Sequence, residues 1–393
     1  MAGLLSVDEA LQAVLVRVEP LPAERVRLQE ASGRVLAEPA RALVDLPPFP
    51  SSAMDGYAVR AADTPGRLPI VARIAAGRPA SRPLAAGEAM GIATGGVVPE
   101  GADAVVPIER VTVDGEQVEL PEAAAAGSNV RPRGGDVVAG DVVVPAGVRL
   151  GPAQIGALAA AGVGEVACAR RPRVAVLTTG TELRRPGEPL AAGEIYESNG
   201  PMLQALLASA GAVVEPLDSV EDDEAAHRGA IEQGLERDVL VSSGGVSVGP
   251  HDLVRRIEAE LGVEEVFWGV SVKPGKPLAF GVRGQTLVFG LPGNPVSSLV
   301  SSVLFVLPAL RALQGESDPA PHYRQGVLAA PVRPDPRRDE LVRARLTPAG
   351  ELDPLSGQES HMIVRAAEAN ALIFVPTGAE ELGVGSIVRF LAL

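Results

Sequence analysis

The chain has 393 residues, a formal net charge of −14, 46% hydrophobic residues and a single cysteine, Cys168. This length exceeds one ordinary core, so we expect two to four domains. The acidic balance argues against a nucleic-acid partner, because phosphate contacts need a basic surface. No run of eighteen apolar residues and no basic leader occur, so we expect no membrane segment. One cysteine excludes a disulfide framework, and a cytoplasmic location is the expectation.

Residue patterns change twice within the first 170 positions. Residues 1–45 and 149–170 are predicted to form an elongated helical domain, because both begin with amphipathic or small-residue stretches. Residues 46–148 hold runs of four to eight alternating residues separated by glycine, which predicts a β domain. The proline-rich sequence PPFPSSAMDG opens this β domain as a loop.

Strands and helices alternate in the second half of the chain. Residues 171–315 contain buried apolar runs such as RVAVLTTG and DVLVSSGG, separated by helical stretches such as PMLQALLASAGA. This alternation is typical of a doubly wound α/β domain. Residues 316–393 return to short strands and predict a small C-terminal β domain. The fold class is therefore multidomain, α/β and β.

Three strands of the predicted α/β domain end in loops rich in Gly, Ser, Thr and Pro. Ligands of doubly wound sheets bind outside the carboxyl ends of the strands, and backbone N–H groups in such loops suit phosphate. Each loop alone is weak evidence, since such turns are common and neither standard nucleotide fingerprint occurs. The candidate binding residues in or near these loops are Thr179, Gly180, Asn199, Ser243, Gly244, Gly245, Ser247, Pro292, Asn294 and Pro295.

Carboxylates near two of these loops suggest a Mg²⁺ site. Glu182 and Asp252 follow strand ends of the same sheet, and Mg²⁺ shared with substrate phosphates takes one or two carboxylates. The competing interpretation is solvated charge at Glu182 and a helix cap at Asp252. In the β domain, Asp55, Thr94 and Asp136 lie in loops that could equally be turns.

Only two of the 35 basic residues are lysines, Lys273 and Lys276. An arginine-rich chain that keeps two lysines three residues apart suggests compact ammonium groups that arginine cannot replace. Histidine is rare: His227 is expected on an exposed helix face, His322 in a linker and His361 beside Ser360. We therefore expect chemistry by metal, electrostatics and positioning, without a histidine base.

Eight motifs in order resemble the MoeA/gephyrin family of molybdopterin molybdenumtransferases. They are PPFPSSAMDGYAVR, GIATGGVVPEGADAVVPIE, NVRPRGGDVVAGDVVVPAG, AVLTTGTEL, IYESNGPML, LVSSGGVSVGPHD, VKPGKPLAFG and LPGNPVSS. The resemblance implies an elongated helical part, a β domain, a molybdopterin-binding α/β domain and a C-terminal β-barrel-like domain. It also implies a homodimer whose cleft lies between the α/β domain of one subunit and parts of the other.

The resemblance also implies roles for individual residues. It implies that the matching positions are functional residues: Asp55, Thr94, Asp136, Glu182, Asp252, Lys273, Lys276, Arg343 and Ser360. The implied reaction inserts molybdate, as substrate, into adenylylated molybdopterin with Mg²⁺ and releases AMP. Other cofactor-biosynthesis proteins are expected as partners. Two alternatives stay open at this point: a molybdopterin adenylyltransferase that consumes ATP, and a non-catalytic gephyrin-like scaffold.

Overall fold

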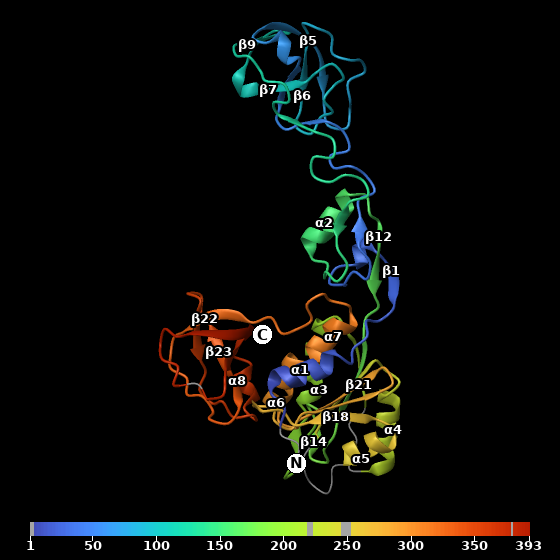
Figure 1. Cartoon of the computed structure of the whole chain (residues 1–393), viewed down its shortest axis with the longest axis vertical. Coiled ribbons are helices and arrows are strands. Elements are labelled where there is room, and N and C mark those ends of the chain that lie inside the picture. Colours follow the sequence, from blue (N-terminus) through green and yellow to red (C-terminus); the bar gives the residue numbers. More distant parts are fainter. Residues whose placement is uncertain (1–3, 218–222, 245–252, 379) are drawn as a thin grey trace.

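The computed structural model describes residues 4–217, 223–244, 253–378 and 380–393. The molecule is elongated, with a β unit at one end, a small middle unit, and an α/β unit beside a barrel at the other end (Figure 1). Both ends of the chain lie near the α/β unit and the barrel. The predicted fold class is confirmed in these parts, whereas the division points at residues 45, 148, 170 and 315 stay predictions.

The α/β unit is built on a six-stranded sheet with strand order β16-β13-β17-β21-β20-β18. Its strands are β13 (Arg173–Thr178), β16 (Val213–Pro216), β17 (Val239–Ser243), β18 (Glu264–Trp268), β20 (Ala279–Arg283) and β21 (Thr286–Leu291). The first four strands in spatial order are parallel, and β20 and β18 are antiparallel additions. From β13 the chain adds β16 on one side and then β17 on the other side, so the strand order reverses between β13 and β17. Ligands of this fold bind at such a switch point.

Helices cover both faces of this sheet. They are α3 (Asn199–Ser209), α4 (Glu224–Gly234), α5 (Leu253–Glu260), α6 (Pro295–Ser301) and α7 (Leu307–Leu313), with the π-helical segment η4 (Ser302–Val306) joining the last two. Alternate residues of β13 point to opposite faces, as strand geometry requires. Val174 and Val176 pack with α3 and α6, whereas Ala175 and Leu177 pack with α4 and α5.

Among the described residues, the continuous helical segment Pro295–Leu313 is long and apolar enough to span a membrane. Buried positions make up 78% of it. Its side chains, including Val300 and Phe305, belong to the main hydrophobic core. The apolar composition of this helix is therefore explained by packing inside the protein.

The N-terminal segment departs from the helical prediction. Helix α1 (Val7–Leu15) forms as expected, but it packs on the core of the α/β unit. Between α1 and the β unit the chain forms short strands and loops: β1 (Ala23–Arg27) pairs with β12 (Glu165–Ala169), and β2 (Ala40–Arg41) pairs with β11 (Val142–Val144). The prediction of a helical domain over 1–45 was wrong beyond α1, because these strands find partners more than a hundred residues away.

The middle unit holds these strand pairs, helix α2 (Pro152–Ala160) and their small core. The β unit contains a sheet of order β7-β4-β6-β5-β9-β8. Its strands are β4 (Gly56–Val59), β5 (Gly66–Ile74), β6 (Ala89–Ile92), β7 (Ala104–Pro107), β8 (Thr112–Asp114) and β9 (Gln117–Leu120). A separate pair joins β3 (Ser51–Ser52) to β10 (Val130–Arg131). Short 3-10 turns are η1 (Leu28–Glu30), η2 (Ala61–Asp63) and η3 (Ile108–Arg110).

The C-terminal strands close into a five-stranded barrel. They are β22 (Arg324–Leu328), β23 (Asp339–Leu346), β24 (Glu351–Pro354), β25 (Ala371–Val375) and β26 (Ile387–Ala392), and helix α8 (Ile363–Ala366) lies between two of them. The order β23-β24-β22-β26-β25 returns to β23, which completes the ring. Strand β19 (Val272–Lys273) leaves the α/β unit and pairs with β23, so the barrel and the α/β unit share a seam.

Candidate active site

The three loops predicted to bind a ligand lie side by side at one edge of the sheet. Strands β13, β17 and β21 are neighbours and parallel, and their last residues are in register: Thr178 faces Ser243, and Ser243 faces Leu291. The loops after these residues therefore start at the same height, at the switch point of the fold. Carboxyl-end loops of a parallel sheet converge because each strand is buried and fixed by its neighbours.

A cavity of about 750 Å³ opens over these strand ends. It is lined by Thr178, Thr179, Gly180, Glu182, Leu183, Ile195, Tyr196, Glu197, Ser198, Asn199, His227, Ser243, Gly244, Leu253, Val254, Pro277, Pro292, Gly293, Asn294, Pro295, His361 and Ile363. A second cavity of about 590 Å³ adjoins it and shares Thr178, Gly180, Leu183 and Glu197. Each cavity lies within the usual size range of a small-molecule site.

Asn199 connects the end of β17 with the loop after β21. Its Nδ2 donates to Ser243 Oγ and to the carbonyl oxygen of Gly293, each at 2.8 Å. The residue is 9% exposed, and its Oδ1 is buried without a hydrogen-bond partner. A buried acceptor without a donor costs free energy, and such groups call for an explanation. Here the explanation is the cavity that Asn199 lines, because a bound ligand can supply the missing donor.

Close backbone approach requires glycine at Gly244. This residue has φ +96°, and a Cβ there would lie 2.6 Å from the carbonyl oxygen of Thr179. A larger residue would therefore push apart the loops after β13 and β17.

Among the residues that the structure describes, two carboxylates line the cavity, Glu182 and Glu197. Glu197 Oε1 accepts a hydrogen bond from the N–H of Gly200 at 2.8 Å. No cluster of three or more His, Cys, Asp or Glu side chains suited to a metal occurs among the described residues. Mg²⁺ that is shared with substrate phosphates usually takes only one or two carboxylates from the protein, so two carboxylates are enough for such a site.

His227 is not on an exposed face as predicted. It is 1% exposed, lines the cavity, and its Nδ1 lies 3.0 Å from the carbonyl oxygen of Asp223. The prediction failed because the residues around His227 are mostly polar, although α4 turns His227 toward the sheet. His361 also lines the cavity, from the C-terminal barrel.

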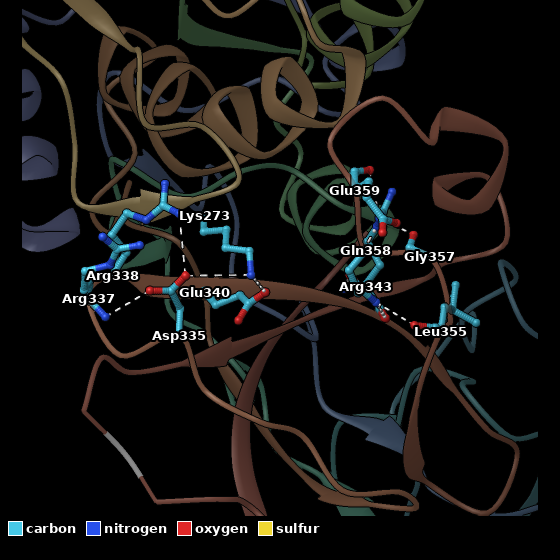
Figure 2. A network of polar contacts seen from close by, with 10 residues as sticks. All are labelled: Lys273, Asp335, Arg337, Arg338, Glu340, Arg343, Leu355, Gly357, Gln358 and Glu359. Atoms are coloured by element: carbon cyan, nitrogen blue, oxygen red, sulfur yellow. Dashed lines mark hydrogen bonds and ion pairs between the residues drawn. The ribbon is translucent and has the colours of Figure 1, made fainter.

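The two lysines are not among the cavity-lining residues. Lys273 Nζ lies 3.0 Å from Glu340 Oε1 and 3.8 Å from Asp335 Oδ2, both in the C-terminal part (Figure 2). A hydrogen bond from the N–H of Arg337, aided by nearby cations, holds the pKa of Asp335 below its ordinary value despite burial. Lys276 is exposed. The structure thus gives Lys273 a role at the seam between the two units, and a role of either lysine toward substrate stays a prediction.

Arg343 is buried inside the barrel, with 1% exposure. Its guanidinium donates to the carbonyl oxygens of Gly357 at 2.6 Å and Glu359 at 3.2 Å (Figure 2). It also donates to the carbonyl oxygen of Met362 at 3.0 Å. Burial lowers the pKa of this guanidinium. Nearby Ser360 Oγ accepts from Asn294 Nδ2 at 2.8 Å.

Asp55 and Thr94, next to β4 and β6, lie in the β unit at the opposite end of the molecule from the cavity (Figure 1). Asp136 lies beside the middle unit, because the adjacent Val137 packs against the core of that unit. Asp55 Oδ1 accepts from the N–H of Thr94 at 2.8 Å, so these two predicted residues are together. Both are exposed, as is Asp136. One chain therefore does not bring these three residues to the cavity. Gly245, Ser247 and Asp252 lie outside the described residues.

Glu197, His227 and His361 were not among the predicted site residues. Glu197 lies in the motif IYESNG, two residues before Asn199, and this closeness to a predicted site residue could have identified it. His361 follows the predicted Ser360 directly. Nothing in the local sequence shows that α4 turns His227 inward.

This architecture defines a multidomain α/β protein with a ligand site at the strand ends of a doubly wound sheet. Three family models match along the chain: the MoeA N-terminal region (domain I and II) over residues 5–162, a probable molybdopterin binding domain over 175–312, and the MoeA C-terminal region (domain IV) over 325–393. The chain belongs to the MoeA family.

Named relatives agree over nearly the full length. Molybdopterin molybdenumtransferase 2 of Mycobacterium tuberculosis is 36% identical, with 97% of this chain and 98% of that protein covered. Molybdopterin molybdenumtransferase of Haemophilus influenzae is 37% identical over 81% of each chain. The crystal structure of a molybdopterin biosynthesis MoeA protein from Pyrococcus horikoshii superimposes with a TM-score of 0.87 at 28% identity, covering 100% of both chains.

Proposed function

We propose that this chain is a molybdopterin molybdenumtransferase that inserts molybdate into adenylylated molybdopterin and releases AMP. The observation that carries the proposal is the cavity over β13, β17 and β21, where Asn199 joins the end of β17 to the loop after β21 and keeps one buried acceptor unpaired. The names of full-length relatives give the reaction class. A cavity this large at a switch point suits a ligand with a nucleotide and a second ring system.

In this proposal the residues at the cavity bind and orient the ligand. Asn199 Oδ1 accepts a hydrogen bond from the ligand, while its Nδ2 keeps the loops of Ser243 and Gly293 in place. Glu182 and Glu197 are the carboxylates that would hold Mg²⁺, which when bound neutralises phosphate charge as the pyrophosphate bond is cleaved by water. The protein contributes preorganised donors and acceptors, and no covalent intermediate on the chain is needed.

We further propose a homodimer with shared sites. Asp55 and Thr94 form a joined pair in the β unit, at the far end of the same chain from the cavity (Figure 1). A second copy can place its β unit over the cavity of the first, and a two-fold axis then creates two equal sites. A cytoplasmic location fits the single buried cysteine, Cys168, which has no second cysteine to pair with.

Formation of the molybdenum-bearing pterin tests the proposal. Purified protein is mixed with adenylylated molybdopterin, molybdate and Mg²⁺, and the pterin product is identified by mass spectrometry. We expect molybdenum in the dithiolene product at a rate that Asn199→Ala lowers. Production of adenylylated molybdopterin from molybdopterin and ATP would instead assign the adenylyltransferase reaction.

A further inference from the structure

The chain between β13 and α3 forms a flap, residues 182–197, beside the larger cavity. Two short strands, β14 (Leu183–Arg184) and β15 (Ile195–Tyr196), pair in parallel within it, and Arg184 lies opposite Tyr196. Leu183 lines both cavities, whereas Tyr196 lines the larger cavity and Arg184 the smaller one. The flap therefore lies between the two cavities.

Tyr196 presents an aromatic ring of this flap to the larger cavity. Among the lining residues that the structure describes, neither cavity has another phenylalanine, tyrosine or tryptophan. The chain has three tyrosines, and the other two are explained by packing. Tyr57 is 3% exposed in the core of the β unit, and Tyr323 packs edge-on against Phe374. Tyr196 is 47% exposed, so its ring has room for a partner.

The ring of Tyr196 is held at both ends before a ligand arrives. Its backbone belongs to β15, and its hydroxyl donates to the carbonyl oxygen of Glu188 at 2.9 Å. The N–H of Glu197 donates to the carbonyl oxygen of Arg184 at 2.8 Å, which continues the strand pairing past the tyrosine. Because a side chain that is already held loses little conformational entropy on binding, more of its contact energy is retained as affinity.

An ion pair joins the two strands of the flap. Arg184 Nη2 lies 2.6 Å from Glu194 Oε1. Arg184 Nη1 also donates to the carbonyl oxygens of Leu183 at 2.8 Å and Thr181 at 3.1 Å, and Glu194 Oε2 accepts from the N–H of Ala191 at 2.7 Å. Glu194 is not among the described lining residues of either cavity, so it acts on the site through the flap.

A held and exposed tyrosine ring suits a flat heteroaromatic ligand. An offset stack combines the interaction of the two π-systems with the burial of apolar surface. Stacking of a nucleobase on an aromatic side chain changes affinity about tenfold or more when the side chain is replaced by alanine. Adenylylated molybdopterin contains two such ring systems, an adenine and a pterin.

We propose that Tyr196 is a substrate-contacting residue whose ring stacks on a heteroaromatic ring of the substrate, and that Glu194 is the residue that positions it through Arg184. The inference rests on the proposed function and deepens it, because it names the part of the ligand that the flap recognises. The stacked ring is the adenine or the pterin of adenylylated molybdopterin.

Three variants of Tyr196 separate stacking from other roles. Tyr196→Phe keeps the ring without its hydroxyl, Tyr196→Leu keeps an apolar side chain without a ring, and Tyr196→Ala removes both. We expect the KM for adenylylated molybdopterin to rise about tenfold in the Leu and Ala variants, and less than about threefold in the Phe variant. The value of kcat should change little, as for a contact made equally in the ground state and the transition state.

The matched control is Leu190→Ala. Leu190 is 43% exposed in the same flap and is not among the lining residues of either cavity, so the control should keep the wild-type KM. An equal loss in all three Tyr196 variants would show that the hydroxyl supports the flap and that the ring does not stack, which overturns the proposal. The half-saturating Mg²⁺ concentration should stay unchanged in Tyr196→Leu, because a rise would show a distorted flap around Glu182.

Calorimetric titrations of Tyr196→Leu identify the stacked ring. AMP with Mg²⁺ reports on the adenine, and molybdopterin without a nucleotide reports on the pterin. An affinity about tenfold weaker for one of these ligands supports the proposal and assigns the ring. Unchanged affinity for both ligands overturns it. A wild-type protein that binds neither ligand and releases no AMP overturns the proposed function instead, so the two failures are distinct.

Glu194→Gln tests the positioning role. The substitution keeps the size of the side chain and removes the charge that pairs with Arg184. We expect the KM for adenylylated molybdopterin to rise about threefold in the single variant, with no further rise when it is combined with Tyr196→Ala. An unchanged KM in the single variant, or additive effects in the double variant, would show that Glu194 does not act through Tyr196.

Discussion

Single residues at the strand ends hold the loops in place, and one of them, Asn199, also has a buried acceptor without a hydrogen-bond partner. Asn199 donates two hydrogen bonds from its amide nitrogen to the protein, and its amide oxygen is buried without a protein partner. Gly244 permits the backbone of one loop to lie against the next. These residues were predictable because each stands next to a buried strand or helix start in the sequence. His361 was not, because the barrel brings it to the cavity from another part of the chain.

Asn199→Ala should lower both ligand affinity and stability. The variant removes two hydrogen bonds within the protein and the amide oxygen that would accept a hydrogen bond from the ligand. We therefore expect the affinity for adenylylated molybdopterin to fall at least about tenfold and the free energy of unfolding to fall by about 2 kcal/mol. Calorimetry and urea unfolding measure the two effects. Asn370→Ala is the control, since Asn370 also bonds backbone groups, at Leu346, but lies in the barrel away from the cavity. Equal ligand affinity in both variants would contradict the assignment.

Glu182→Gln should weaken the response to Mg²⁺. The substitution keeps the shape of the side chain and removes the charge that a hard cation requires, so we expect the half-saturating Mg²⁺ concentration to rise about tenfold. Glu232→Gln on α4 is the control, because Glu232 is exposed and does not line the cavity. The measurement is initial rate against Mg²⁺ concentration. An unchanged curve would remove Glu182 from the metal site and leave Glu197 as the carboxylate to test.

The elements of the α/β unit agree closely with the sequence prediction because each has a strong local signal. The buried apolar runs RVAVLTTG and DVLVSSGG became β13 and β17, and the predicted helical stretch PMLQALLASAGA became α3. Parallel strands buried on both faces make such runs necessary. The segment after α1 departed from the prediction, since β1 is set by its pairing with β12 rather than by its own pattern. Long-range pairing of short strands is the information that local periodicity lacks.

An ion pair ties the entry of the α/β unit to its central strand. Arg170 donates from Nη1 and Nη2 to both carboxylate oxygens of Asp238, each at 2.6 Å, and the N–H of Arg173 donates to Asp238 at 2.7 Å. Burial raises the pKa of Asp238, but these hydrogen bonds lower it more, so the net pKa lies below its ordinary value. A depressed carboxyl pKa stabilises the fold above the unfolded pKa and loses this effect as pH falls.

Asp238→Asn should therefore destabilise the fold by about 2 kcal/mol at pH 7, through loss of charged hydrogen bonds. The difference from wild type should shrink as pH falls below about 4, the ordinary aspartate range. Urea unfolding at pH 7 and at lower pH measures both values. A difference that stays constant with pH would show that the charge of Asp238 is not what stabilises this junction.

At the scale of the whole molecule, the chain separates its candidate residues into two places. The β unit carries Asp55 and Thr94, and the other end carries the cavity with the barrel beside it (Figure 1). The sequence motifs showed that all these segments belong to one family pattern, but their separation became visible only with the arrangement of the units. Such a shape makes a second copy the natural source of the distant residues.

Mixed dimers test that sharing. Asp55→Ala and Glu182→Ala proteins should each be nearly inactive alone, because each removes one half of every site. Random pairing of equal amounts should restore about a quarter of wild-type activity, since half of the dimers are hybrids and each has one intact site. Light scattering confirms that dimers have formed. Inactive hybrids would place both residues in the same chain's site or remove Asp55 from the reaction.

The most direct test of the central claim is AMP release from purified adenylylated molybdopterin, measured with Mg²⁺ in the presence and absence of molybdate. We predict release that depends on molybdate and that Asn199→Ala slows. Retention of AMP under both conditions, while the ligand still binds, would contradict the transferase and leave the cavity as a carrier or scaffold site.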